Sequence, residues 1–168
     1  MLNMKKEMVV IFLSVCCMAG CGRQVTKNSS MRINASEITE AVYDDGIPYI
    51  VAENYFVKNN LEALPPEKIV SKTDFNANFG MAATMGDNGM PTKIDFKHQY
   101  VISVTLPETN IHTEIVPKGL KKDDDGRIIF SYQIKLGDKL TYTMIPSLLI
   151  VVDRKYEGKV VLDAIGNI

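Results

Sequence analysis

The chain has 168 residues, enough for one domain of ordinary size. Hydrophobic residues make up 46% of it and charged residues 23%, a composition typical of a folded globular protein and not of a disordered one. The formal net charge is -1, so no excess of positive charge is available to gather phosphates, and nucleic acid is excluded as the main ligand.

The N-terminal segment is typical of a secretory leader. Lys5 and Lys6 precede an apolar run over residues 8–19. This run has the length of a signal-peptide core and is too short to cross a bilayer interior of about 30 Å as a helix. We therefore expect a leader that is removed. A buried N-terminal helix is one alternative, and a plain secretory signal peptide in which Cys21 is incidental is another.

The leader ends in Met-Ala-Gly-Cys at residues 18–21, which resembles the lipobox of bacterial lipoproteins. The resemblance implies cleavage before Cys21 and fatty acyl chains, such as palmitate, on that cysteine. Several acyl chains on one residue anchor a protein stably, whereas one chain alone holds only marginally. The expected organisation is a lipoprotein signal peptide over residues 1–20, the lipidated cysteine with a flexible tether over 21–35, and one β-rich domain over 36–168.

The cysteines set two further expectations. Cys16 and Cys17 lie in the leader, so only Cys21 would remain after cleavage and the domain would hold no internal disulfide. Gly22 and Arg23 stand where lipoproteins of enteric bacteria that stay at the inner membrane carry an aspartate. We therefore favour the outer membrane of a bacterial cell envelope over the inner membrane, which is the alternative. The sequence does not distinguish the periplasmic face from the cell surface.

Three elements are expected in the first half of the domain. Residues 35–43 carry the pattern of a short helix, and residues 48–57 that of an extended run. A second short helix is expected over residues 71–79, because Ser71 or Thr73 can cap its first turn.

The second half of the domain carries strand patterns, with apolar and polar residues alternating at a period of two. We expect strands over residues 100–106, 113–121, 127–136, 140–144, 148–152 and 159–163.

Two hairpin turns are expected between these strands. The Asp-Asp-Asp-Gly segment at residues 123–126 joins one pair, and residues 136–139 join the next. The run at residues 148–152 is apolar on both faces, as in a strand covered on both sides. The predicted fold class is α+β, mostly β: a single twisted antiparallel sheet curling into a sandwich or partial barrel, with one or two short helices.

Two loops are candidate contact surfaces for a protein partner. The loop at residues 80–92 is rich in methionine, whose flexible side chain suits adaptable apolar contacts. The turn at residues 107–112 is the second. An open alternative is that the methionines fill the end of the sheet as ordinary core. The candidate contact residues are Met81, Met85, Asp87, Asn88, Met90, Pro107, Glu108 and Asn110.

No motif points to catalysis or to a cofactor. His98 and His112 are the only histidines, and their positions in strand patterns favour surface residues over metal ligands. The aspartates at 123–125 lack the glutamate that would complete a calcium loop, so a turn explains them better, with weak surface calcium binding left open. No hydrolase, zinc-protease or nucleotide-binding signature occurs. We expect no catalytic residue, no cofactor and no metal.

Residues 69–161 resemble the C-terminal domain of bacterial PrcB-type protease-complex subunits and related envelope lipoproteins. The matching features are the capped segment at 71–80, the glycine-rich loop after it, the Asp-Phe and alternating strand within 92–104, and a proline before a final hydrophobic strand at 145–151. The resemblance implies a non-catalytic β-rich module that assists or restrains a partner protein. The expected function is therefore a lipid-anchored protein-binding module. An inhibitor or regulator of an envelope peptidase and an enzyme with an unrecognised site are the alternatives.

Overall fold

The computed structural model describes residues 40–41, 46–59, 61–83, 85 and 89–167. These residues belong to one compact unit of the chain, Ser36–Ile168. The expected leader, the lipidation site Cys21 and the tether lie outside the described residues. The elements are β1 (Glu40–Ala41), β2 (Tyr49–Val51), β3 (Tyr55–Val57), β4 (Lys68–Ile69), α1 (Lys72–Asn78), β5 (Phe79–Met81), β6 (Gln99–Thr105), β7 (Thr109–Lys122), β8 (Ile128–Met144), β9 (Ser147–Asp153), the 3-10 helix η1 (Arg154–Tyr156) and β10 (Val160–Asn167).

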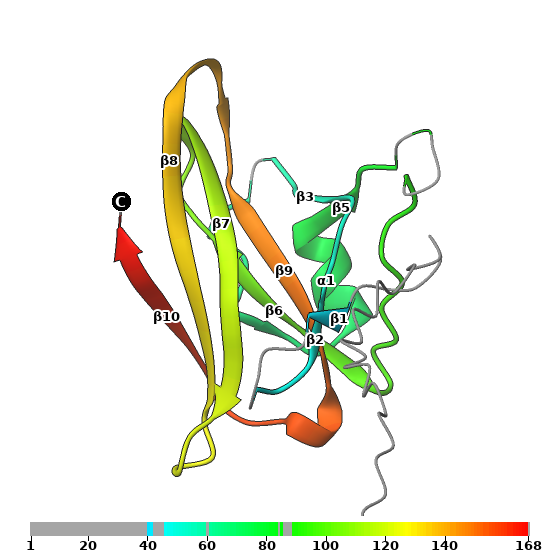
Figure 1. The fold of residues 1–168 in the computed structure, drawn as a ribbon. Coiled ribbons are helices and arrows are strands. Elements are labelled where there is room, and N and C mark those ends of the chain that lie inside the picture. The colour runs from blue at the N-terminus through cyan, green and yellow to red at the C-terminus, as the bar shows by residue number, and fades with distance from the viewer. Residues whose placement is uncertain (1–39, 42–45, 60, 84, 86–88, 168) are drawn as a thin grey trace, which may run out of the picture. The chain divides into compact units, whose positions relative to one another are not determined.

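Strands dominate the described residues, and the predicted α+β, mostly β class is confirmed (Figure 1). The strands form a five-stranded sheet in the order β1-β2-β9-β6-β4, a three-stranded sheet in the order β10-β8-β7 and the pair β3-β5. The sandwich form is therefore observed, with the strands divided among three sheets rather than joined in one. Most neighbours are antiparallel, but β10 pairs parallel with β8.

Two hydrophobic clusters lie on the two faces of the five-stranded sheet. The first lies between this sheet and the β10-β8-β7 sheet, and Tyr49, Tyr100 and Phe130 are its largest fully buried side chains. The second lies on the other face, where α1 and the β3–β5 pair cover the sheet (Figure 1). Alternate residues of β9, such as Ile150 and Val151, enter the two clusters in turn. The expectation that this strand is covered on both sides is confirmed.

The predicted helix at residues 71–79 is confirmed as α1. The Ser71 side chain caps it by accepting a hydrogen bond of 3.0 Å from the Asp74 backbone N–H. Phe75 and Phe79 are both buried, and their rings stack with centroids 5.2 Å apart. Phe79 already belongs to β5, so the helix ends one residue earlier than expected. No helix among the described residues is long and apolar enough to span a bilayer.

The predicted helix at residues 35–43 is wrong where the structure describes it. Glu40 and Ala41 form β1, and they pair antiparallel with Ile50 and Tyr49. The outer edge of β2 offers backbone partners to this segment, and such pairing overrides a weak local preference for helix. The other residues of the predicted helix lie outside the described ones.

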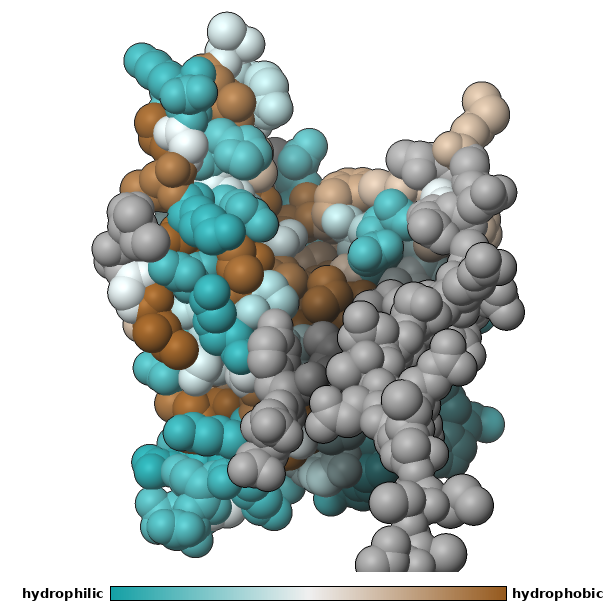
Figure 2. Space-filling view, viewed as in Figure 1, coloured by the Kyte–Doolittle hydropathy of each residue, from teal (hydrophilic) through white to brown (hydrophobic). Residues whose placement is uncertain are grey.

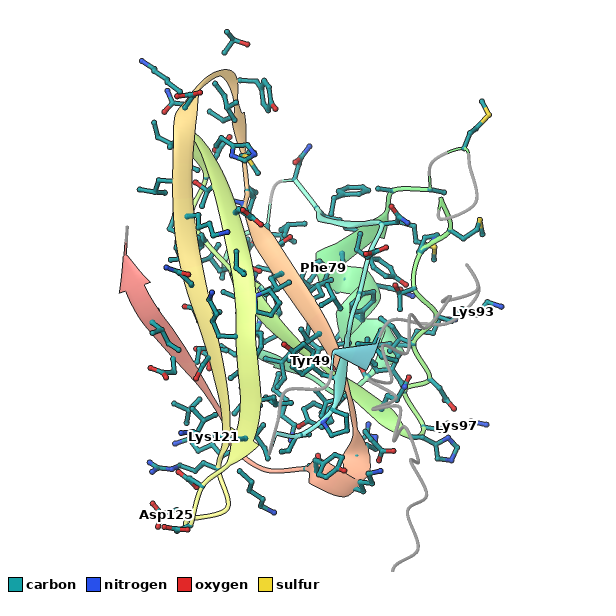
Figure 3. All side chains as sticks on the ribbon, viewed as in Figure 1. Tyr49, Phe79, Lys93, Lys97, Lys121 and Asp125 are labelled. Carbon is teal, nitrogen blue, oxygen red and sulfur yellow. The ribbon has the colours of Figure 1, made fainter. Side chains whose placement is uncertain are left out.

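The predicted turn at residues 123–126 is confirmed. Gly126 has a φ of 78°, and its N–H donates to the Asp123 carbonyl at 3.0 Å. The Arg127 guanidinium contacts the carboxylates of Asp123 at 2.7 Å and Asp125 at 3.1 Å. Desolvation acts to raise the pKa of Asp123, but the hydrogen bonds from Arg127 outweigh it and hold that pKa below its usual range. The single positive charge of Arg127 thus offsets part of the negative charge of this turn, whose Asp125 lies at the tip between β7 and β8 (Figure 3).

The predicted turn at residues 136–139 is wrong, because β8 runs through it as one strand. Leu136 pairs with Thr113 of β7, and Lys139 pairs with Ile111 of the same strand. A turn here would have sent the following residues back along β8, whereas they continue beside β7. Over this stretch β8 has more residues than β7, and shifts in the pairing register accommodate the difference, as in a β-bulge.

Tyr100 is a fully buried tyrosine of the first cluster. The Lys68 Nζ lies 5.0 Å from the centre of its ring, and its hydroxyl donates weakly to the Tyr156 carbonyl at 3.4 Å. Burial and the nearby Glu157 carboxylate raise its pKa to about 12. The folded protein therefore favours the neutral phenol.

This pKa predicts an alkaline loss of stability. Tyr100 contributes to the free energy of unfolding in full below pH 10, the ordinary pKa of a tyrosine, and this contribution is lost as the pH rises through about 12. Tyr100→Phe is expected to make the alkaline loss of stability shallower. In an ultraviolet titration of phenolate absorbance, it is expected to remove one of the seven tyrosines from the phase near pH 12. Tyr142→Phe, at an exposed position, is the control and leaves that phase in place. An unchanged phase in Tyr100→Phe would contradict the assignment.

Candidate functional site

The two facing sheets differ in length, and this difference creates the candidate site. β7 and β8 have 14 and 17 residues, whereas β6 and β9 have seven each. The inward-facing residues of β8 run from Phe130, which is fully buried, through Ile134 to Leu136, which is 61% exposed. The apolar face of the β7–β8 ribbon therefore continues beyond the sheet that covers it.

A groove of about 390 Å³ occupies this uncovered end, and we call it the end groove. Its base is held by a hydrogen bond of 2.9 Å from the Leu106 backbone N–H to the Pro146 carbonyl. The volume lies within the range of about 300–1,000 Å³ that is usual for ligand pockets. The lining residues are Leu106, Pro107, Glu108, Thr109, Thr113, Ile134, Leu136 and Pro146.

The polar groups at the end groove bond to their own neighbours. The Glu108 carboxylate accepts a hydrogen bond from the Thr143 hydroxyl. The Thr109 hydroxyl accepts from the Ile111 backbone N–H at 3.1 Å, and the Thr113 hydroxyl donates to the Ile111 carbonyl at 2.9 Å. These bonds stiffen the ribbon end and leave apolar side chains as its main contact surface.

The structure brings two of the predicted contact residues into this groove. Pro107 and Glu108 line it, and Asn110 is exposed on the same end of β7. Figure 2 shows hydrophobic and hydrophilic residues alternating over the surface of the β7–β8 ribbon. At the groove itself, the exposed Glu108 and Asn110 stand beside an apolar lining, an arrangement typical of a protein contact surface with an apolar centre.

The methionine loop lies elsewhere, beside β3. Met81 pairs with Tyr55 across the β3–β5 pair, and the Asn54 side chain donates to the Met90 carbonyl at 3.1 Å. Met81, Met85 and Met90 are 66%, 104% and 76% exposed, so the alternative that they fill the core is wrong. Met81 ends β5, Met85 and Met90 follow it in the loop, and none of the three belongs to either hydrophobic cluster. Asp87 and Asn88 lie outside the described residues.

Both histidines lie on the surface, as predicted. The His98 Nδ1 lies 2.8 Å from an Asp95 carboxylate oxygen. Hydrogen bonds from His98 and from the Lys97 backbone N–H lower the pKa of Asp95. Among the residues that the structure describes, no group of three or more His, Cys, Asp or Glu side chains could hold a metal ion.

Several residues of the end groove were missed in the sequence. Leu136 lies where the predicted strand at 127–136 meets the predicted turn at 136–139, and Ile134 lies within that strand; neither is among the predicted contact residues. A signal was available in the alternation itself, since it continues past residue 134 for longer than the runs at 100–106 and 148–152. A comparison of those lengths would have predicted an overhang.

A search with this chain against protein-family models, curated proteins and solved structures found no match.

Proposed function

We propose that the chain is a lipid-anchored, non-catalytic protein-binding module of a bacterial envelope, held at the outer membrane through Cys21. The end groove carries the protein-binding part of this proposal, because it is an apolar surface that none of the described residues covers. The lipobox-like residues before Cys21 support the anchoring part.

The chemistry of the end groove favours a protein partner. Leu136 and Pro107 present exposed apolar surface, while Glu108 and Asn110 supply a polar rim. Because hydrogen bonds already hold the backbone at this end of the ribbon, that backbone loses little conformational freedom on binding, and more of the contact energy remains as affinity. The groove therefore suits an apolar side chain of a partner that is anchored at the same membrane or free beside it.

Site-specific cross-linking in the native cells tests this proposal. A photo-reactive residue at Asn110 is expected to capture a partner protein in the wild-type background. Leu136→Asp is expected to reduce the adduct at least about tenfold, because burying a leucine contributes roughly 1.5–3 kcal/mol. Leu64→Asp is the matched control, since Leu64 is 52% exposed and lies outside the end groove.

Equal adducts in the two leucine variants, or none in the wild type, would contradict the proposal. If the captured partner is a peptidase that the purified chain inhibits, the result assigns the alternative function of peptidase regulation through the same groove.

A further inference from the structure

A second groove lies where β3 separates from β9. The extended run at residues 48–57 first follows β9, and its last bond to that strand is from the Ala52 N–H to the Leu149 carbonyl at 2.8 Å. Asn54 then has a φ of 61°, and the chain turns to pair with β5 instead. The chain therefore leaves β9 after β2, and the start of β9 before Leu149 has no paired strand on this edge among the described residues.

The backbone groups of β3 alternate between the two sides of the strand. The Lys58 N–H donates to the Asn78 carbonyl at 2.9 Å, and the Asn54 carbonyl accepts from the Ala82 N–H at 2.9 Å. Residues 54, 56 and 58 therefore turn their backbone groups toward β5. In an antiparallel pair the intervening residues point the other way, so those of Tyr55 and Val57 face away from β5.

The same reasoning places Ser147 of β9. Leu149 turns its carbonyl toward β2, and the backbone N–H and C=O of a residue two positions away point to the same side. Ser147 therefore presents both groups on the side that β2 has left. Within the described residues, no strand pairs with Ser147 on the β2 side of β9. None pairs with Tyr55 or Val57 on the side of β3 that faces away from β5.

These three residues line one groove of about 380 Å³, which we call the β3–β9 slot. Its walls include Phe56, which is 46% exposed, and the partly buried Met144 and Ile145. In Figure 1 the β3–β5 pair lies on the side of β9 away from the β7–β8 ribbon, so this slot is distinct from the end groove. Apolar walls with backbone donors and acceptors on two edges are the features of a missing strand.

We propose that the β3–β9 slot binds one extended peptide segment of a protein partner, which adds as a short strand beside β3 and the start of β9. The backbone groups of Tyr55 and Val57 are two residues apart, which is the repeat of a strand. An acyl chain could use the apolar walls but not the donors and acceptors. The segment is expected to be rich in β-branched and aromatic residues. This inference rests on the protein-binding part of the proposed function and not on the lipid anchor.

Selection from a displayed peptide library tests whether an extended peptide binds the β3–β9 slot. The full chain is immobilised in detergent and used to select random peptides from a displayed library, and the enriched peptide is synthesised. Ser147→Pro removes the N–H that faces the slot without removing a bond to β6, and proline is tolerated at the first position of a strand. It is expected to weaken binding at least about tenfold. Ser147→Ala, the matched control, keeps the N–H and is expected to bind as the wild type does.

Amide exchange measured by nuclear magnetic resonance gives a second test on the wild-type chain. Before peptide is added, the amides of Tyr55, Val57 and Ser147 are expected to exchange fast, and those of Phe56 and Lys58 slowly. The peptide is expected to protect the first three. This measurement decides the question even if Ser147→Pro does not fold.

Four results would overturn the inference. Two concern the peptide: no peptide is enriched, or the two Ser147 variants bind it with equal affinity. The other two concern the chain alone: the three amides are protected before peptide is added, or the chain forms a dimer that Ser147→Pro dissociates. The last two would assign the slot to the chain's own N-terminal segment or to a second copy. Because Leu136 does not line this slot, Leu136→Asp leaves peptide binding unchanged. Failure of the slot is therefore distinguishable from failure of the end groove.

Discussion

Phe130→Ala is expected to lower the free energy of unfolding by about 3–5 kcal/mol. Phe130 is fully buried between the two sheets, where its ring meets that of Tyr49 edge-on with centroids 5.9 Å apart and stacks on Tyr132 at 6.1 Å. Truncation removes the transfer energy of the ring and leaves a cavity that two sheets held by backbone ladders cannot close. Since domains are stable by only about 5–15 kcal/mol, this loss is a large share of the total.

Urea unfolding of the purified protein measures this effect. The urea concentration at the midpoint is expected to fall, while the slope of the free energy of unfolding against urea concentration stays the same, because the surface exposed on unfolding hardly changes. Phe56→Ala is the matched control: Phe56 is 46% exposed, so the same truncation is expected to lower stability by roughly 1 kcal/mol. Similar losses in the two variants would show that the space between the sheets is not the main core.

Cys21→Ser is expected to abolish incorporation of labelled fatty acid and to release the protein from membranes. The proposed anchor depends on several acyl chains, and each buried methylene contributes about 0.8 kcal/mol, so loss of the thioether removes nearly all of the binding energy. Fractionation of labelled cells measures both effects. Cys17→Ser, within the expected leader, is the matched control and is expected to keep both the label and the membrane location.

Mass spectrometry of the natural product gives an independent check. An unmodified thiol at Cys21, or residues retained ahead of it, would contradict the anchor. The protein-binding proposals would stand in that case, because the end groove and the β3–β9 slot are built from residues of the folded domain alone.

Features set by neighbouring residues were predicted correctly. The Ser71 cap depends on one side chain and a backbone N–H three residues away. The turn at residues 123–126 depends on a glycine with positive φ and on Arg127 close by. Alternation within residues 100–106 and 148–152 identified β6 and β9, because the two faces of a strand differ wherever one face or both are buried.

Features set by distant residues were not predicted. Gly137 and Asp138 are common turn residues, yet β8 passes straight through them because β7 supplies a partner on both sides of this point. The parallel pairing of β10 with β8 joins Val160 to Ile128 and has no local signal. Asn54 adopts the left-handed conformation that asparagine accepts more readily than most residues, but no neighbouring residue indicates that β2 pairs with β9 before it and β3 pairs with β5 after it.

The amino-acid sequence by itself determined the mostly β class, the positions of the main strands and the capped helix, since each depends on spacing within a few residues. Only the tertiary structure decided which strands pair, where the long β7–β8 ribbon outruns its facing sheet and which backbone edges stay open. The reason is physical: strand pairing and burial depend on contacts between segments far apart in the chain. Among the described residues, those contacts leave the end groove and the β3–β9 slot uncovered.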